Sequence, residues 1–188
     1  MMGRREVCHD PFSGAQIRIG VMGSASEPVD PSVAALCRRL GRTVAERGCC
    51  LLTGACPGLP HEAVLGAKEV GGHVVGISPA SALREHVERY DSPYREYDVL
   101  IFTGLGLMGR ELVNIRSSDI VVVIGVLSGT GGITDALRTI ETSLRKDTGA
   151  EVLHEGEPAR LVDRLLGRYR SPDYVCPCRP ASRRGERG

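Results

Sequence analysis

The strongest constraint on this chain is an alternation of short apolar runs and amphipathic, helix-like segments, with a period of about 30 residues. The first apolar run, residues 16–22, ends at a glycine and a serine. The next segment opens with Asp30, a helix N-cap residue, and Pro31 at the first helical position. Strands alternating with helices form right-handed βαβ units. We therefore predict an α/β, Rossmann-like three-layer sandwich with a mostly parallel sheet.

The same patterns assign the remaining elements. We expect further strands at residues 49–53, 73–77, 98–102, 119–127 and 151–154. We expect helices at residues 31–47, 60–70, 108–117, 134–146 and 158–169. Residues 78–97 are polar and contain two prolines, which predicts a loop with a short helix. One domain is expected over residues 16–169, between an N-terminal tail, 1–15, and a flexible C-terminal tail, 170–188.

Composition narrows the partners that the chain can have. The net charge of +1 argues against nucleic acid, because binding to a phosphate backbone needs a basic excess. No apolar run approaches the roughly 20 residues that span a bilayer, and the charged start lacks a signal sequence, so no membrane and a cytoplasmic location are expected.

The seven cysteines are an odd number scattered through predicted strands and helices, which is typical of buried free thiols. Cys176 and Cys178 lack a second pair of ligands, so no metal site is predicted.

Glycine-rich turns follow the predicted strands, at the sheet edge where α/β proteins bind ligands. The firmest of these candidate sites lies just before the helix that opens at Pro60, where glycines and a helix N-terminus favour a phosphate group. Gly23 and Ser24, after the first strand, would add contacts to the same ligand. The residues expected to bind are Thr53, Gly54, Ala55, Gly58 and Leu59. The same loop is equally compatible with a strand–helix turn that binds nothing.

Three common motifs are excluded. The chain has no G-x-x-x-x-G-K-[ST] phosphate loop, and its first turn is not G-x-G-x-x-G. The second strand also ends without the acidic residue that holds an NAD ribose. His61 and Glu62 begin a zinc-protease pattern, but Leu65 occupies the position of the second histidine.

Residues 53–78, TGACPGLPHEAVLGAKEVGGHVVGIS, resemble the core signature of the LOG family in the Rossmann-like SLOG superfamily. The spacing from Gly109 and Arg110 to Ser118 and Asp119 supports the resemblance, which is greatest to the branch of molybdenum cofactor carrier proteins. It implies a homodimer with a nucleotide or related phosphate ligand over the strand ends. The ligand would be a molybdopterin-type cofactor or an AMP-like nucleotide.

Enzymatic members of the family are nucleoside 5′-monophosphate phosphoribohydrolases, which use an arginine and the glutamate of a G-T-x-x-E motif. The resemblance assigns the arginine to Arg110, although Glu111 stands where the family has lysine. Gly129 and Thr130 fall on the G-T and would contact the phosphate, but Ile133 replaces the glutamate.

Asp135, Glu111 and Glu62 are the candidate substitutes for that glutamate, with Asp135 as the assigned catalytic carboxylate. Asp135 could instead be a first-turn acid that stabilises its helix.

An alternative alignment places residues 124–135 on a later strand and turn of the family. A segment of about 20–25 residues, one βαβ connection, would then be missing, and the chain would have one strand and one helix fewer than its relatives. This deletion favours a binding protein over the hydrolase. The third hypothesis is a scaffold that only dimerises.

Overall fold

The computed structural model describes residues 16–25, 29–124 and 157–170. Five strands form one sheet: β1 (Arg18–Gly23), β2 (Cys50–Thr53), β3 (Val74–Ser78), β4 (Val99–Phe102) and β5 (Ile120–Ile124). The helices are α1 (Pro31–Glu46), α2 (Leu59–Lys68), α3 (Leu83–Glu88), α4 (Gly106–Ser117) and α6 (Pro158–Tyr169).

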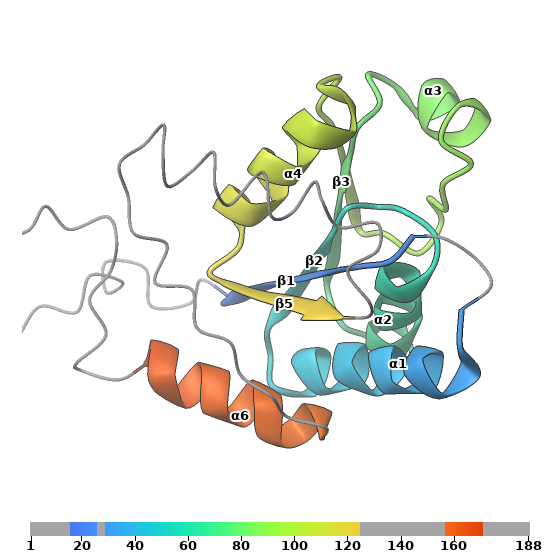
Figure 1. Ribbon diagram of the computed structural model, residues 1–188. Helices are drawn as coiled ribbons and strands as arrows, with labels where there is room; N and C mark the ends of the chain where they lie inside the picture. The colour runs from blue at the N-terminus through green and yellow to red at the C-terminus, as the bar shows by residue number, and fades with distance from the viewer. Residues whose placement is uncertain (1–15, 26–28, 125–156, 171–188) are drawn as a thin grey trace, which may run out of the picture.

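The strands lie in the order β4-β3-β2-β1-β5, and every neighbouring pair is parallel. The chain therefore builds one half of the sheet from β1 outward and then crosses over, through α4, to place β5 on the other side of β1. Helices α1 and α6 lie on one side of the sheet and α4 on the opposite side (Figure 1). This arrangement confirms the predicted Rossmann-like α/β sandwich.

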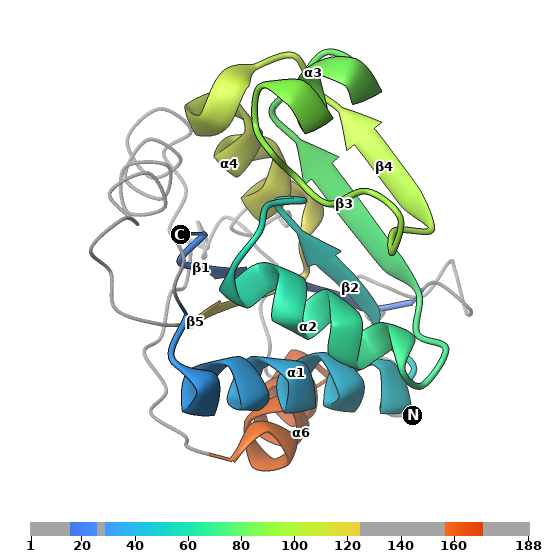
Figure 2. The ribbon, with the colours of Figure 1, turned by 90° about the vertical axis from the view of Figure 1, so that its right-hand side faces the viewer.

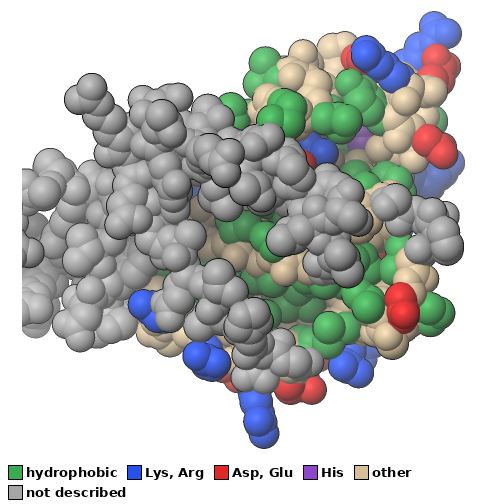
Figure 3. Space-filling model, viewed as in Figure 1, with side chains coloured by type: hydrophobic (Ala, Val, Ile, Leu, Met, Phe, Trp, Pro, Cys, Tyr) green, Lys and Arg blue, Asp and Glu red, His purple; other side chains and the backbone are tan. Residues whose placement is uncertain are grey.

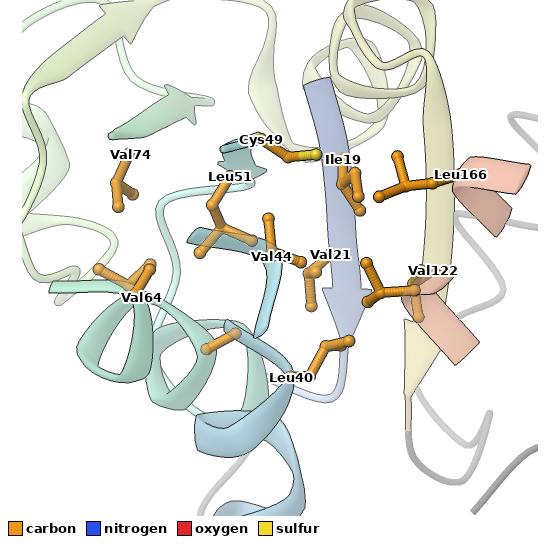
Figure 4. Packing of buried hydrophobic residues seen from close by; sticks show 13 residues of the cluster. Ile19, Val21, Leu40, Val44, Cys49, Leu51, Val64, Val74, Val122 and Leu166 are labelled. Carbon is orange, nitrogen blue, oxygen red and sulfur yellow. The ribbon is translucent and has the colours of Figure 1, made fainter. Parts of the chain in front are cut away.

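The side of the sheet that faces α1, α2 and α6 is closed by apolar packing (Figure 4). Alternate residues of β1 and β2, together with β5, point their side chains into this layer, where α1 and α2 cover them. Burial of each such side chain stabilises the fold by roughly 1.5–3 kcal/mol. The buried cluster includes Ile19, Val21, Leu40, Val44, Leu51, Val64, Val74, Val122, Val162 and Leu166.

Helices α1 and α2 approach so closely that their backbones touch. A Cβ atom on Gly41 would lie 1.8 Å from the Ala63 carbonyl oxygen, and one on Gly66 would lie 1.8 Å from the Arg38 carbonyl oxygen. Only glycine fits at these two crossing points. Asp30 caps α1 as predicted, since its Oδ1 accepts a hydrogen bond of 2.8 Å from the Ser32 N–H.

The opposite side of the sheet carries a smaller apolar cluster, built from Cys50, Leu52 and Ile77 with Val113 of α4 packed against it. Among the described residues, none covers the outer strand β4 on this side, and Ile101 is 45% exposed. On the face shown in Figure 3, hydrophobic side chains are visible in the middle, and most of the visible charged side chains lie toward the margin.

The predicted elements within the described residues are confirmed to within about three residues at each end. The expected short helix of residues 78–97 is α3. Cys37, Cys49, Cys50 and Cys56 are free thiols, and the first three are buried. The expected helix 134–146, strand 151–154, both tails and the pair Cys176 and Cys178 lie outside the described residues.

The strand β5 runs unbroken from Ile120 to Ile124 and pairs with β1 along that length. No loop or helix interrupts β5 between these two residues, which agrees with the alignment that has a missing segment. That the chain has one strand and one helix fewer than its relatives stays a prediction. Within the described ranges, no helix is both long and apolar enough to cross a membrane.

Candidate functional site

The loop after β2 lies against the loop after β1, as the sequence predicted. Gly58 has a φ of +76°, and a Cβ atom there would lie 2.5 Å from the Ser24 carbonyl oxygen. The Leu59 N–H donates to the same oxygen at 3.0 Å. Glycine at position 58 is therefore required both by backbone conformation and by the close approach of the two loops.

The glycine loop is held in a tight turn at its start as well. The Ala55 N–H donates to Thr53 Oγ1 at 3.2 Å, and Ala55 takes a φ of +49°, which is unusual for a residue with a side chain. The backbone is thus fixed on both sides of Cys56 before any ligand arrives.

The backbone N–H groups in the first turn of α2 already donate hydrogen bonds to other groups of the protein. The His61 and Glu62 N–H groups donate to the Gly58 carbonyl oxygen at 3.1 Å and 3.2 Å, and Pro60 has no N–H. The helix end keeps its partial positive charge. Its donors are nevertheless engaged, so a ligand would meet the loop 54–58 before it meets the helix itself.

Arg110 of α4 is the central side chain of the site. It is only 5% exposed, and its guanidinium lies directly on the glycine loop: a Cβ on Gly54 would fall 1.3 Å from Arg110 Nη1. Its Nη2 lies 3.2 Å from Glu111 Oε1. Its buried Nε has no hydrogen-bond partner among the described residues. The sequence also allows a solvated or structural arginine at a helix start; the burial of Arg110 rules out the solvated form, and a structural role stays open.

Glu111 and Cys56 surround this guanidinium. Burial raises the pKa of the Glu111 carboxyl, while the charge of Arg110 opposes the shift. Burial also raises the pKa of the Cys56 thiol, against the charge and a hydrogen bond from Arg110. One oxygen of Glu111, Oε2, is buried and unpartnered within the described structure. The end of β2 thus gathers a cation, a carboxylate and a thiol in a poorly hydrated place.

Asn114 lies one helical turn beyond Arg110 on the same face of α4. Its side chain is 0% exposed, yet neither its amide nitrogen nor its oxygen has a partner among the described residues. Sequence reasoning missed this residue. The signal was present as polar residues at positions 110, 111 and 114 of a helix that should be apolar on its inner face.

An open pocket of about 580 Å³ lies beside the glycine loop. Ala25, Pro57 and His61 line one wall, and residues 91–96, which precede β4, line the other. This pocket was also missed, because nothing in residues 78–97 indicates that they return to the side of α2.

The remaining predicted site residues divide into two groups. Gly129, Thr130 and Asp135 lie outside the described residues. Glu62 is held by Arg38, whose Nε lies 3.0 Å from Glu62 Oε2 on the outer side of the α1–α2 pair. Glu62 is therefore occupied in an ion pair between helices. In the described ranges, no three side chains are grouped so as to hold a metal ion.

Residues 16–139 match the SLOG cluster4 family over their whole length. The chain belongs to this family. The match spans β1 to β5 and includes both loops and the arginine of the site, which confirms the superfamily suggested by the glycine-loop signature.

Several proteins of known structure or sequence are similar to this family member. The molybdenum cofactor carrier protein of Chlamydomonas reinhardtii is 27% identical, with a TM-score of 0.60 over 81% of this chain and 99% of that one. The molybdenum cofactor binding protein of Rippkaea orientalis is 25% identical, with a TM-score of 0.58 over 82% and 99%. An uncharacterized protein of Archaeoglobus fulgidus is 30% identical over 61% of this chain and 68% of its own.

Proposed function

We propose that this protein binds a phosphorylated, nucleotide-like ligand over the carboxyl ends of β1 and β2. The phosphate would lie on Arg110 and the glycine loop, with help from Gly23 and Ser24 and, outside the described residues, from Gly129 and Thr130. The observation that carries the proposal is the Arg110 guanidinium, which is buried on Gly54 with an unpartnered Nε.

A buried guanidinium with one carboxylate partner is costly to maintain. Removing a charge from water costs several kcal/mol, and the cost is recovered only when hydrogen bonds satisfy every donor. Arg110 has five donors in a planar fork that fits a phosphate. Its Nη2 lies against Glu111 Oε1, a further hydrogen bond runs to Cys56, and Nε has no partner among the described residues. An anionic ligand would satisfy the rest, since a phosphate brings charge and several acceptors together.

The family relationship supports the choice of ligand. The two solved relatives described above are a carrier and a binding protein of molybdenum cofactor. A molybdopterin-type cofactor, which carries a phosphate, is accordingly our first candidate. AMP-like nucleotides, which present the same phosphate group, are the second.

The proposal is tested by mass spectrometry of ligand carried through purification, followed by calorimetric titration with AMP, GMP and ribose 5-phosphate. We expect Arg110→Met to weaken binding of each phosphorylated compound by at least about 30-fold, since a charge-assisted hydrogen bond to a buried group is lost. Arg116→Met is the matched control, because Arg116 is an exposed arginine on the same helix. Equal affinity of the two variants would overturn the proposal.

A second candidate function is nucleoside 5′-monophosphate phosphoribohydrolase activity. The half-buried Glu111 favours it, because a carboxyl group with a raised pKa beside the phosphate-binding arginine can act as an acid or base. Incubation with AMP and assay for free adenine distinguishes the two candidates. Turnover that Glu111→Gln abolishes, with AMP binding retained, would establish the hydrolase.

A further inference from the structure

One wall of the pocket beside the glycine loop is formed by residues 91–96, and a buried histidine fixes it from inside. His86 is completely buried, and both of its ring nitrogens are engaged: Nδ1 lies 2.8 Å from Ser78 Oγ, and Nε2 lies 3.0 Å from the Pro93 carbonyl oxygen. The imidazole therefore joins the wall of the pocket to the end of β3.

Tyr97 holds the other end of this wall. Its hydroxyl lies 3.4 Å from Thr53 Oγ1, at the end of β2. Figure 2 shows the connection from α3 to β4 passing on the same side of the sheet as α2. Because residues 91–96 are fixed at both ends, the pocket is formed before a ligand binds, which lowers the entropic cost of binding.

Two carboxylates line this pocket without a partner. Asp91 and Glu96 form neither an ion pair nor a side-chain hydrogen bond with any other residue in the described part of the chain. Most of the other described carboxylates are paired, as Glu62 is with Arg38. The pocket therefore presents acceptors that the protein itself does not use.

The other titratable groups of the lining leave the pocket negative. Burial lowers the pKa of His61, although the charges of Glu96 and Glu62 oppose the shift, so the ring is neutral at pH 7. Arg95 supplies one positive charge against the two carboxylates. A phosphate would be repelled from this pocket, and a cation would be attracted to it.

The rest of the lining suits a flat cation on an apolar stem. Tyr94 is 37% exposed, and the Arg95 guanidinium lies 5.2 Å from the centre of its ring. This contact shows that the ring accepts a planar cation. Pro57 and Pro93 offer apolar surface for an aliphatic stem, and a volume of about 580 Å³ is within the range of pockets that hold small organic ligands.

We propose that this pocket binds an organic cation, a guanidinium or primary ammonium group on a short aliphatic stem. Asp91 and Glu96 would accept hydrogen bonds from the cation, and Tyr94 would pack against it. A guanidinium should bind more tightly than an ammonium, because its planar fork pairs with a carboxylate through two hydrogen bonds and stacks on an aromatic ring. This site is separate from the proposed phosphate site and does not depend on it.

Titration of the isotope-labelled full chain, followed by NMR, tests the proposal. Butylguanidinium and butylammonium are the free cations, and butylurea is their uncharged counterpart. A short peptide with one arginine, beside the same peptide with citrulline, presents the cation as a side chain. This pair separates a free ligand from a segment of a partner protein.

Three variants alter the lining: Asp91→Asn, Glu96→Gln and Tyr94→Leu. Asparagine tolerates the φ of +44° that Asp91 adopts, so the first variant removes the charge and keeps the backbone. Glu46→Gln is the matched control, because Glu46 is an exposed carboxylate of α1 that does not line the pocket.

We expect butylguanidinium to bind at least about 10-fold more tightly than butylurea and to shift the resonances of residues 91–96. Asp91→Asn and Glu96→Gln should each weaken the cation by about 3-fold to 5-fold. Tyr94→Leu should weaken it by about 3-fold, and Glu46→Gln should leave it unchanged. Equal binding of the free cation and the arginine peptide indicates a free ligand, and much tighter binding of the peptide indicates a partner chain.

Three results would overturn the proposal. In the first, neither a free cation nor the arginine peptide binds the wild-type protein. In the second, butylurea binds as tightly as butylguanidinium. In the third, Asp91→Asn and Glu96→Gln lose no more affinity than Glu46→Gln does. None of these results bears on the proposed phosphate site, which depends on Arg110.

Discussion

The two sides of the sheet differ in where their polar side chains lie and in whether those side chains are paired. On the side of α1, α2 and α6, the interior is apolar, and the charged side chains stay at the surface in ion pairs such as Arg38–Glu62 and Arg47–Asp163. On the side of α4, polar side chains are buried at the helix–sheet boundary. Within the described residues, every buried unpartnered side-chain atom except His61 Nδ1 belongs to α4.

This difference separates the stabilising half of the molecule from the half proposed to bind. A fully apolar, closely packed layer contributes most of the burial energy. Unpaired buried polar groups work in the opposite direction, at about 1–3 kcal/mol each. Under the proposed function, the unpaired polar groups beside the glycine loop would be kept to bind a ligand, and the apolar packing around α1, α2 and α6 would offset their cost.

The largest expected effect is on the closed side, at the crossing of α1 and α2. Gly41→Ala would push a methyl group into the Ala63 backbone, so we expect a loss of about 3 kcal/mol in the free energy of unfolding, although alanine is the better helix former. Urea denaturation of wild type and Gly41→Ala measures this difference in the free energy of unfolding.

The control for this change is Gly167→Ala in α6, where a Cβ atom would meet nothing within 4 Å. It should stabilise the protein by about 0.5–1 kcal/mol. If both alanines had the same effect, the close contact of the two helices would not be a feature of the folded protein.

The second largest loss of stability is expected where Arg18, at the start of β1, pairs with Asp119, just before β5. Arg18 donates to Asp119 from its backbone N–H at 2.9 Å, from Nε at 3.0 Å and from Nη2 at 2.9 Å. Burial alone would raise the pKa of Asp119, but these hydrogen bonds outweigh it and lower the pKa below the ordinary value of 3.8. We expect Asp119→Asn to cost about 1.5–2 kcal/mol at pH 7.

The pH dependence of that cost follows from the lowered pKa. The stabilisation is present above the unfolded-state pKa of 3.8 and is lost as the pH falls through the lower pKa of the folded state. Wild type and Asp119→Asn should therefore converge in stability in strong acid. Asp163→Asn, at a solvent-exposed pair, should leave stability nearly unchanged at every pH. A pH-independent gap for Asp119→Asn would contradict the assignment.

The smallest effect is expected on the α4 side and has the opposite sign. Asn114→Leu removes two buried polar atoms that have no partner in the described structure, so stability should stay equal or rise by about 1 kcal/mol. Chemical denaturation of this variant beside Leu52→Ala, on the same side of the sheet, gives the contrast. A loss of more than 1 kcal/mol for Asn114→Leu would mean that its amide is hydrogen-bonded in solution.

The sequence was sufficient for the parts of the fold that local patterns specify. The apolar, β-branched run Val121–Val123 predicted a strand, and Asp30 with Pro31 predicted the start of α1. Burial of this strand on both sides, which such a run also suggests, is wrong for Val123, which is 41% exposed. The neighbouring loops at Ser24 and Gly58 were also predicted, because the carboxyl ends of parallel strands share one edge.

The missed features depend on contacts between distant segments. In the sequence, Asn114 is an ordinary helix residue, and its burial follows only from the packing of α4 against the sheet. His61 is an ordinary first-turn residue, and its place in the pocket depends on residues 91–96, which line the opposite wall. Likewise, the motif placed Arg110 at the site, but only the structure shows its guanidinium lying on Gly54. Local periodicity carries no information about such long-range neighbours.

The double variant Arg110→Met/Glu111→Gln tests most directly whether the polar groups of α4 are kept for a phosphorylated ligand. It removes the ion pair as a unit and leaves no unpaired charge. Urea denaturation without ligand, paired with AMP titration, gives stability and affinity for the same protein. We predict stability equal to wild type or up to about 2 kcal/mol higher, with affinity for AMP at least about 30-fold lower. A variant that is less stable than wild type but binds AMP equally well would show that Arg110 and Glu111 serve the fold.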